Sequence, residues 1–190
     1  MRLSTKYSIK VPENIKVIYN NSKNIIVFIG PLGKKSLKLK LKLLVNNFEK
    51  LIYVTKESNV TFSGNQKKLL DSLRGTVTAL IKQNLLEVSV TLYKKLELIG
   101  VGYKVFPVEN NLNSILHFKL GFSHSIFFKL TSETKALCFK ATNLYLFGNS
   151  FNHVNQLASI IRSYKIPEPY KGKGILYKNE KIKLKEGKKV

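Results

Sequence analysis

The chain has 190 residues and is strongly basic, with 33 Lys and Arg residues against 11 Asp and Glu residues and a formal net charge of +22. Its hydrophobic fraction of 44% is sufficient for one large folded domain or two small ones. Because such a charge imbalance repels itself, we expect a polyanionic partner, either nucleic acid or an anionic membrane. Thirty of the basic residues are lysines, which favours recognition of a phosphate backbone over bidentate reading of bases.

Several classes of protein and site are disfavoured by the sequence. No apolar run approaches the roughly 20 residues that span a bilayer, so we expect no membrane insertion. The single cysteine, Cys138, has no partner for a disulfide, which fits a reducing compartment. His117, His124 and His153 are not spaced as metal ligands, and no G-x-S-x-G motif is present. We therefore expect no metal, no cofactor and no enzymatic activity.

The first half of the chain predicts several strands followed by a helix. Strands are expected where short apolar runs are β-branched or alternate with polar residues, at 15–19, 25–29, 37–43, 48–55 and 59–62. Leu and Lys alternate over 37–43, which predicts one strand with a basic, solvated face. From Leu69 to Ile81 the apolar residues follow a helical period, so we expect a helix that packs on the sheet.

The second half repeats this order of elements. Alternating apolar residues predict strands at 88–99, 115–122, 126–130, 137–141 and 144–147. A helical period then runs from Phe151 to Tyr164, before Pro167. Gly100 and Gly102 interrupt one apolar run, and because no third glycine follows, they indicate a bulge or a close backbone approach and not a nucleotide-binding loop.

An internal repeat supports a duplicated architecture. The segment 60–65 and the segment 144–149 are similar, each ends in Gly-Asn, and each precedes a helical pattern. We therefore predict an α+β protein of two tandem duplicated small domains, each an antiparallel sheet packed on one face by a helix, followed by a basic tail. The expected boundaries are 1–84, 85–166 and 167–190.

The tail begins with Pro167-Glu168-Pro169-Tyr170-Lys171-Gly172-Lys173-Gly174-Ile175. The prolines favour an extended backbone, the glycines allow close approach to a partner, and Tyr170 provides a flat ring. From Tyr164 to the end there are nine lysines and three glutamates. These features predict an ordered contact with a polyanion, although a solvated charged tail is the alternative.

This stretch resembles, at every position, the C-terminal signature of the large-subunit ribosomal protein L-six family, which is found in bacteria and organelles. The segments 98–103 and 120–124 are also similar to the family, and the similarity extends from about Val11 to the end. The resemblance implies RNA contacts at Tyr170, Lys171, Gly172, Lys173, Gly174, Tyr177, Lys104 and His124. Leu176 departs from the family, because many relatives have arginine there, and it is left out of this set.

The resemblance implies a structural constituent of the large ribosomal subunit that binds domain VI of the large-subunit rRNA, near the sarcin-ricin loop and the factor-binding region. Its partners would then be this rRNA, neighbouring large-subunit ribosomal proteins and, nearby, translation factors. A free-standing RNA-binding protein or RNA chaperone is the alternative, and a peripheral basic membrane binder ranks behind it.

The composition also bears on the compartment. Many lysines, asparagines and isoleucines with few arginines indicate an AT-rich genome, and the strand pattern that begins at Ile15 leaves little room for a transit peptide. We therefore expect an organelle-encoded protein of the mitochondrial ribosome, with the cytoplasm of an AT-rich bacterium or a plastid as the alternative.

Overall fold

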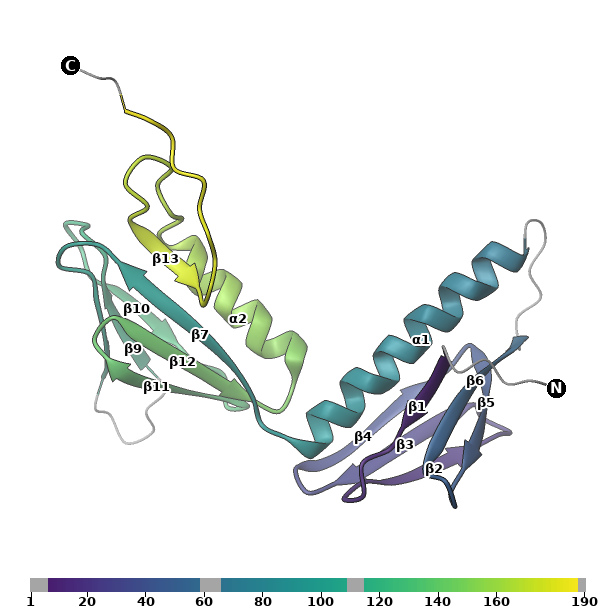
Figure 1. Cartoon of the computed structure of the whole chain (residues 1–190). Coiled ribbons are helices and arrows are strands. Elements are labelled where there is room, and N and C mark those ends of the chain that lie inside the picture. Colours follow the sequence, from purple (N-terminus) through teal and green to yellow (C-terminus); the bar gives the residue numbers. More distant parts are fainter. Residues whose placement is uncertain (1–6, 59–65, 109–114, 188–190) are drawn as a thin grey trace. The chain divides into compact units, whose positions relative to one another are not determined.

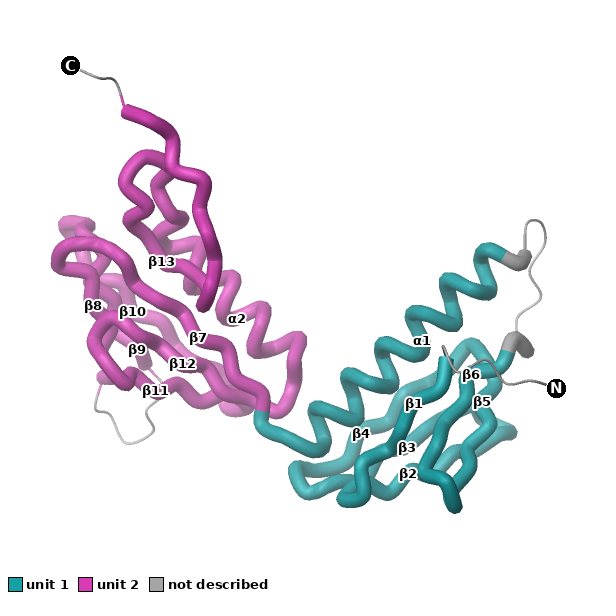
Figure 2. Tube along the Cα trace, in the orientation of Figure 1, with its two compact units in different colours: residues 1–91 teal, residues 92–190 magenta. Residues whose placement is uncertain are grey.

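The computed structural model describes residues 7–58, 66–108 and 115–187, and the chain divides into two compact units, Met1–Thr91 and Leu92–Val190 (Figure 2). This division lies beyond the boundary expected at Asn84. The first helix continues to Ser89, because Ile81, Leu85 and Val88 extend its buried face at helical spacing. The strand predicted from residue 88 therefore starts only after the helix has ended.

Unit 1 contains six strands and one helix among its described residues. They are β1 (Ser8–Lys10), β2 (Lys16–Asn20), β3 (Ile25–Gly30), β4 (Gly33–Lys38), β5 (Leu41–Asn46), β6 (Leu51–Ser58) and α1 (Gln66–Ser89) (Figure 1). The strands form two antiparallel sheets, with the orders β1-β6-β5 and β2-β3-β4. Residues of both sheets and of α1 share one buried core. The strands predicted at 15–19 and 25–29 are confirmed as β2 and β3, which pair as an antiparallel hairpin.

The single strand predicted over residues 37–43 is wrong. The chain leaves one sheet after Lys38 and enters the other at Leu41, so that two strands replace one. The alternation nevertheless persists, because both sheets cover the same core: Leu39, Leu41 and Leu43 are all buried. Of the strands predicted at 48–55 and 59–62, the first corresponds to β6, which runs from Leu51 to Ser58 and pairs with β5 and β1. Residues 59–62 lie outside the described ranges.

Unit 2 contains seven strands and one helix among its described residues. They are β7 (Leu92–Ile99), β8 (Lys104–Pro107), β9 (Ile115–Lys119), β10 (Ile126–Lys129), β11 (Thr134–Lys140), β12 (Asn143–Gly148), α2 (Phe151–Ser163) and β13 (Gly174–Tyr177). The antiparallel sheets have the orders β10-β9-β8 and β11-β12-β7-β13. Helix α2 contacts β7, β12 and β13 through Val154, Leu157, Ala158 and Ile161, all of which are buried.

The two units have the same order of pairing, which confirms the predicted duplicated α+β fold. In each, the first strand pairs with the strand that precedes the helix, three strands form a meander, and a further hairpin leads into the helix. Thus β1 corresponds to β7, the β2-β3-β4 meander to β8-β9-β10, and α1 to α2. The 60–65 half of the sequence repeat lies outside the described residues. Strand β13 has no counterpart in the described part of unit 1. It pairs with the edge of β7 opposite the one that pairs with β12.

Gly100 and Gly121 leave room for the ring of Tyr103. A Cβ on Gly100 would lie 2.8 Å from Cδ2 of Tyr103, and a Cβ on Gly121 would lie 3.1 Å from Cε1 of the same ring. Tyr103 is buried in the core of unit 2. The predicted close backbone approach is confirmed at Gly100, whereas Gly102 has open space around it and a left-handed φ of 78°.

Candidate nucleic-acid interface

The residues from Pro167 to Lys173, here called the C-terminal loop, lie between α2 and β13, which begins at Gly174. Three backbone hydrogen bonds close this loop: Ile175 N–H to Lys165 O (2.9 Å), Glu168 N–H to Lys173 O (3.0 Å) and Gly172 N–H to Glu168 O (2.9 Å). The predicted tail is therefore part of unit 2, because its strand extends the sheet that α2 covers. The loop is held at both ends by regular structure (Figure 1).

The tip of the C-terminal loop exposes a tyrosine and a lysine. Tyr170 is 54% exposed, Lys171 is exposed, and Lys173 and Gly172 are half-buried. Gly172 has a φ of 68°, a left-handed conformation that glycine adopts without strain. The structure thus brings four predicted residues, Tyr170 to Lys173, together on one short loop.

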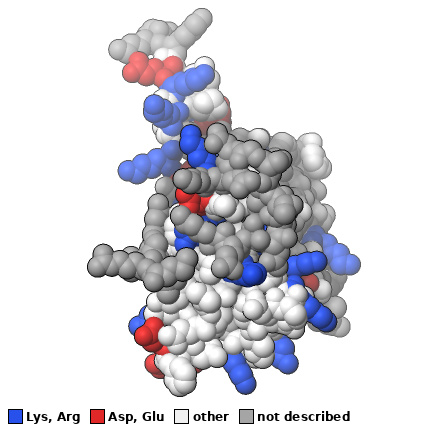
Figure 3. Space-filling model, turned by 90° about the vertical axis from the view of Figure 1, so that its right-hand side faces the viewer, with Lys and Arg blue, Asp and Glu red and all other residues white. Residues whose placement is uncertain are grey.

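More lysines follow β13 and return beside this loop. Lys178, Lys181, Lys183 and Lys185 are exposed, and the amide of Lys185 donates a hydrogen bond of 2.9 Å to the carbonyl of Pro169. Figure 3 shows Lys and Arg side chains projecting in several directions from the C-terminal segment at the top of the view. The loop tip therefore lies in a basic environment.

Gly174 and Leu176 face the protein instead of solvent. Gly174 is buried, and a Cβ there would lie 2.6 Å from the Cα of Pro167. Leu176 is 6% exposed and is the cross-strand partner of Glu97. Glu97 forms a 2.6 Å ion pair with Lys95, a contact that raises the pKa of Lys95. The leucine at 176 therefore occupies a packed position in this chain.

Tyr177 belongs to a charged cluster that holds the end of β13 on α2. Its ring lies under two cations, 5.0 Å from Lys94 Nζ and 5.2 Å from Arg162 Cζ. Arg162 Nη2 donates a 2.5 Å hydrogen bond to Glu180. The Tyr177 amide donates a second hydrogen bond to this carboxylate at 3.0 Å, and the two bonds hold the Glu180 pKa below its usual value. Tyr177 thus stabilises the attachment of β13 to α2 within unit 2.

His124 is linked to the start of the C-terminal loop through Phe122 and Lys165. The His124 and Phe122 rings are stacked with centroids 5.5 Å apart, and Lys165 Nζ lies 4.3 Å from the centroid of Phe122. The carbonyl of Lys165 accepts the Ile175 hydrogen bond that closes the loop. Sequence reasoning missed Phe122 and Lys165 as members of this group, although Phe122 belongs to the same 120–124 segment as His124.

Lys104 belongs to a different sheet from β13. It lies on β8 directly opposite Lys119 of β9, and both lysines are exposed. The predicted residues therefore lie in separate places: Tyr170 to Lys173 on the loop tip, His124 against Phe122, and Lys104 on the β10-β9-β8 sheet. Lys119 was not predicted, and its pairing opposite Lys104 follows only from the register of the two strands.

Other chemistry is sparse in the described parts of the chain. Within residues 7–58, 66–108 and 115–187, no group of three His, Cys, Asp or Glu side chains is placed to hold a metal ion. The helices in these ranges are too short or too polar to cross a membrane. Cys138 is half-buried on β11, and burial raises the pKa of its thiol.

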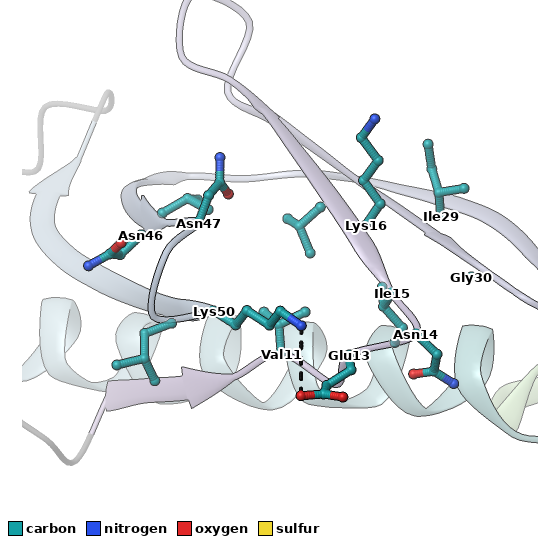
Figure 4. A pocket seen from close by; sticks show the side chains of 13 residues that line it. Val11, Glu13, Asn14, Ile15, Lys16, Ile29, Gly30, Asn46, Asn47 and Lys50 are labelled. Carbon is teal, nitrogen blue, oxygen red and sulfur yellow. Dashed lines mark ion pairs between the residues drawn. The ribbon is translucent and has the colours of Figure 1, made fainter.

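Unit 1 also contains a cavity of about 500 Å³. Figure 4 shows it between the β1–β2 connection and the β5–β6 turn, with the 4.0 Å Lys50–Glu13 ion pair beside it. Its lining is Val11, Glu13, Asn14, Ile15, Lys16, Val17, Ile29, Gly30, Val45, Asn46, Asn47, Lys50 and Leu51. None of the predicted RNA-contacting residues is among them.

Fold and surface together define a duplicated, lysine-rich α+β protein with a basic C-terminal extension. The sequence pattern of the family described as ribosomal protein L6 matches residues 99–178. The chain is 38% identical over 182 residues to large ribosomal subunit protein uL6 of Mycoplasmoides gallisepticum, covering 95% of this chain and 92% of the relative. It is 37% identical to large ribosomal subunit protein uL6m of Reclinomonas americana, covering 95% of each chain.

A third relative extends the coverage further. Large ribosomal subunit protein uL6 of Bordetella petrii is 34% identical over 185 residues, which is 97% of each chain. The chain therefore belongs to the ribosomal protein L6 family, a family of structural, non-enzymatic components of the ribosome.

Proposed function

We propose that this chain is a structural constituent of the large ribosomal subunit that binds large-subunit rRNA through its C-terminal loop. The supporting observation is the loop tip itself, where Tyr170 and Lys171 are exposed on a backbone closed by hydrogen bonds. The proposed contact lies in domain VI, near the sarcin-ricin loop and the factor-binding region, as the family resemblance implies. The partners are this rRNA, neighbouring large-subunit proteins and nearby translation factors.

The binding mechanism follows from the residues at the tip. Lys171 and Lys173 neutralise adjacent phosphates and release their counterions, which lowers the affinity as salt increases. The ring of Tyr170 stacks on an unpaired base or fits a shallow groove, and Gly172 lets the backbone approach closely. Because the loop is closed before RNA binds, little conformational entropy is lost on association. His124 and Lys104 supply further contacts outside the tip.

The compartment we propose is the mitochondrial ribosome. Relatives named uL6m, from Reclinomonas americana and Prototheca wickerhamii, support it, while relatives named uL6 from bacteria leave the cytoplasm of an AT-rich bacterium or a plastid as the alternative. Gradient sedimentation tests assembly: we expect the chain to migrate with the large subunit at high salt. A predominantly free pool would favour the alternative of a free-standing RNA-binding protein or RNA chaperone.

The RNA contact is tested by the double substitution Lys171→Ala and Lys173→Ala in the full chain. We expect weaker binding to a large-subunit rRNA fragment. In a plot of the logarithm of the binding constant against the logarithm of the salt concentration, we expect the slope to be shallower by about 1.5 to 2. The matched control is Lys16→Ala with Lys34→Ala, two exposed lysines of unit 1, which removes the same charge elsewhere. An equal effect of the two double variants would show that net charge, and not the loop tip, determines affinity.

A further inference from the structure

The outward face of the β10-β9-β8 sheet carries a row of aromatic rings. Phe106 and Phe127 are both cross-strand partners of His117, one on each side of it. The rings of His117 and Phe127 are stacked, with centroids 4.8 Å apart and planes 13° from parallel. Phe127 is 62% exposed and Phe106 is 38% exposed. We call these three residues the aromatic row.

The core of unit 2 does not require this row. The alternate residues of the same strands, among them Val105, Leu116 and Phe118, point inward and are almost fully buried. Because side chains alternate between the faces of a strand, Phe106 and Phe127 lie on the opposite side from this core. Their rings therefore leave large apolar surfaces in contact with water, which is unfavourable in the isolated chain.

Lysines flank the aromatic row on both sides. Lys104 and Lys119 are direct cross-strand partners two residues from Phe106 and His117 on one side, and Lys129 lies two residues from Phe127 on the other. All three are exposed, and the three strands contain no Asp or Glu. Like charges directly opposite each other destabilise a sheet, so the Lys104–Lys119 pair is unfavourable until an anion lies between or above them.

The corresponding sheet of unit 1 provides an internal comparison. In the β2-β3-β4 meander, the middle outward row is Ile18, Val27 and Ser36, which are cross-strand partners in the same way. It contains no ring, although the topology is the same. The duplicated fold therefore forms this sheet without aromatic residues, and the aromatic row is a separate property of unit 2.

We propose that the outward face of β10-β9-β8 is a second RNA-binding surface, on which unpaired bases stack on the aromatic row while Lys104, Lys119 and Lys129 contact the flanking phosphates. Rings that are exposed and interleaved with lysines are the combination by which sheets bind single strands, because every base offers a face for stacking. The proposal rests on the proposed function in taking RNA as the partner, and it uses none of the residues of the C-terminal loop.

The chain contains no tryptophan, so Phe127→Trp places a single fluorescent reporter in the aromatic row. We expect a short single-stranded mixed-sequence oligoribonucleotide to quench this fluorescence, and a blunt RNA duplex of the same length to quench it much less. The control is Phe139→Trp on β11, where the native side chain is 83% exposed on another sheet. Absence of quenching, or equal quenching at the two positions, would overturn the proposal.

Affinity gives an independent readout. Phe127→Ala should weaken binding of the same single strand at least about fivefold, Phe127→Tyr should retain it, and Phe139→Ala should leave it unchanged. If the Lys171 and Lys173 double variant loses rRNA binding while the Phe127→Trp reporter is not quenched, the aromatic-row proposal fails and the proposed function stands. A photoreactive group at position 127 gives a further test in the assembled subunit. If it cross-links to a protein instead of RNA, the proposal is also overturned.

Discussion

Gly174→Ala tests whether the C-terminal loop depends on a close contact between backbones. A methyl group at this position would lie 2.6 Å from the Cα, 2.7 Å from the nitrogen of Pro167 and 3.0 Å from the carbonyl carbon of Ile166. These are backbone atoms, and the pyrrolidine ring restricts how Pro167 can rotate away. Relief of the clash therefore requires either the loop or the start of β13 to move.

The expected loss of stability is about 3 kcal/mol. Overpacking alone costs roughly 1–3 kcal/mol, and the upper value applies because no flexible side chain can yield. Movement of β13 would also disturb Ile175, which is fully buried and whose amide donates to Lys165 O at 2.9 Å. For a chain of this length, about 3 kcal/mol corresponds to a decrease in Tm of roughly 6–12 °C.

The assay combines thermal denaturation with amide hydrogen exchange. Circular dichroism reports the Tm, and exchange at Ile175 reports the hydrogen bond to Lys165 O. Exchange at Leu176 and Lys178, whose amides face β7, reports whether β13 leaves the edge of β7. Gly102→Ala is the matched control, because it has a left-handed φ of 78° but no atom within 4 Å of the added Cβ, so only about 1 kcal/mol of backbone strain is expected. If Gly174→Ala melts within 2 °C of the unmodified chain and leaves exchange at Ile175 unchanged, the reasoning about this contact is refuted.

Three further substitutions test other parts of the structure. Gly75→Ala, in the middle of α1 with open space at the added Cβ, should raise the free energy of unfolding by about 0.5–1 kcal/mol in urea denaturation, and a decrease would contradict the assignment of a regular helix there. Ile161→Ala should lower it by about 2–5 kcal/mol, because the side chain is fully buried between α2 and the sheet; an effect below about 1 kcal/mol would contradict that packing. Glu180→Gln should lower it by about 1 kcal/mol at neutral pH. Because the folded pKa of Glu180 is lowered, its contribution is complete above the unfolded value near 4.5 and is lost as the pH falls through the folded value. The difference between Glu180→Gln and the unmodified chain should therefore shrink in acid, and a difference that stays constant down to pH 2 would argue against the Tyr177 and Arg162 contacts.

The sequence by itself determined the class of fold and much of the local structure. Hydrophobic periods identified the hairpin of β2 and β3, the buried face of α2 and the order of strands followed by a helix in both halves. These features depend on residues a few positions apart, so a local pattern is sufficient to predict them. The tail composition likewise indicated the exposed pair Tyr170 and Lys171, because charged and aromatic residues between glycines and prolines cannot form a core.

Only the tertiary structure decided which strands share a sheet and which side chains meet across them. Over residues 37–43 every second residue is apolar, and this pattern fits one continuous strand as well as two strands in different sheets. The reason is that both sheets bury one face in the same core. The pairing of β13 with β7 and the alignment of Phe106, His117 and Phe127 join residues on separate strands, and the contact of Gly174 with Pro167 depends on how the loop between them closes. Such contacts depend on strand register and chain path, which a pattern of neighbouring residues does not specify.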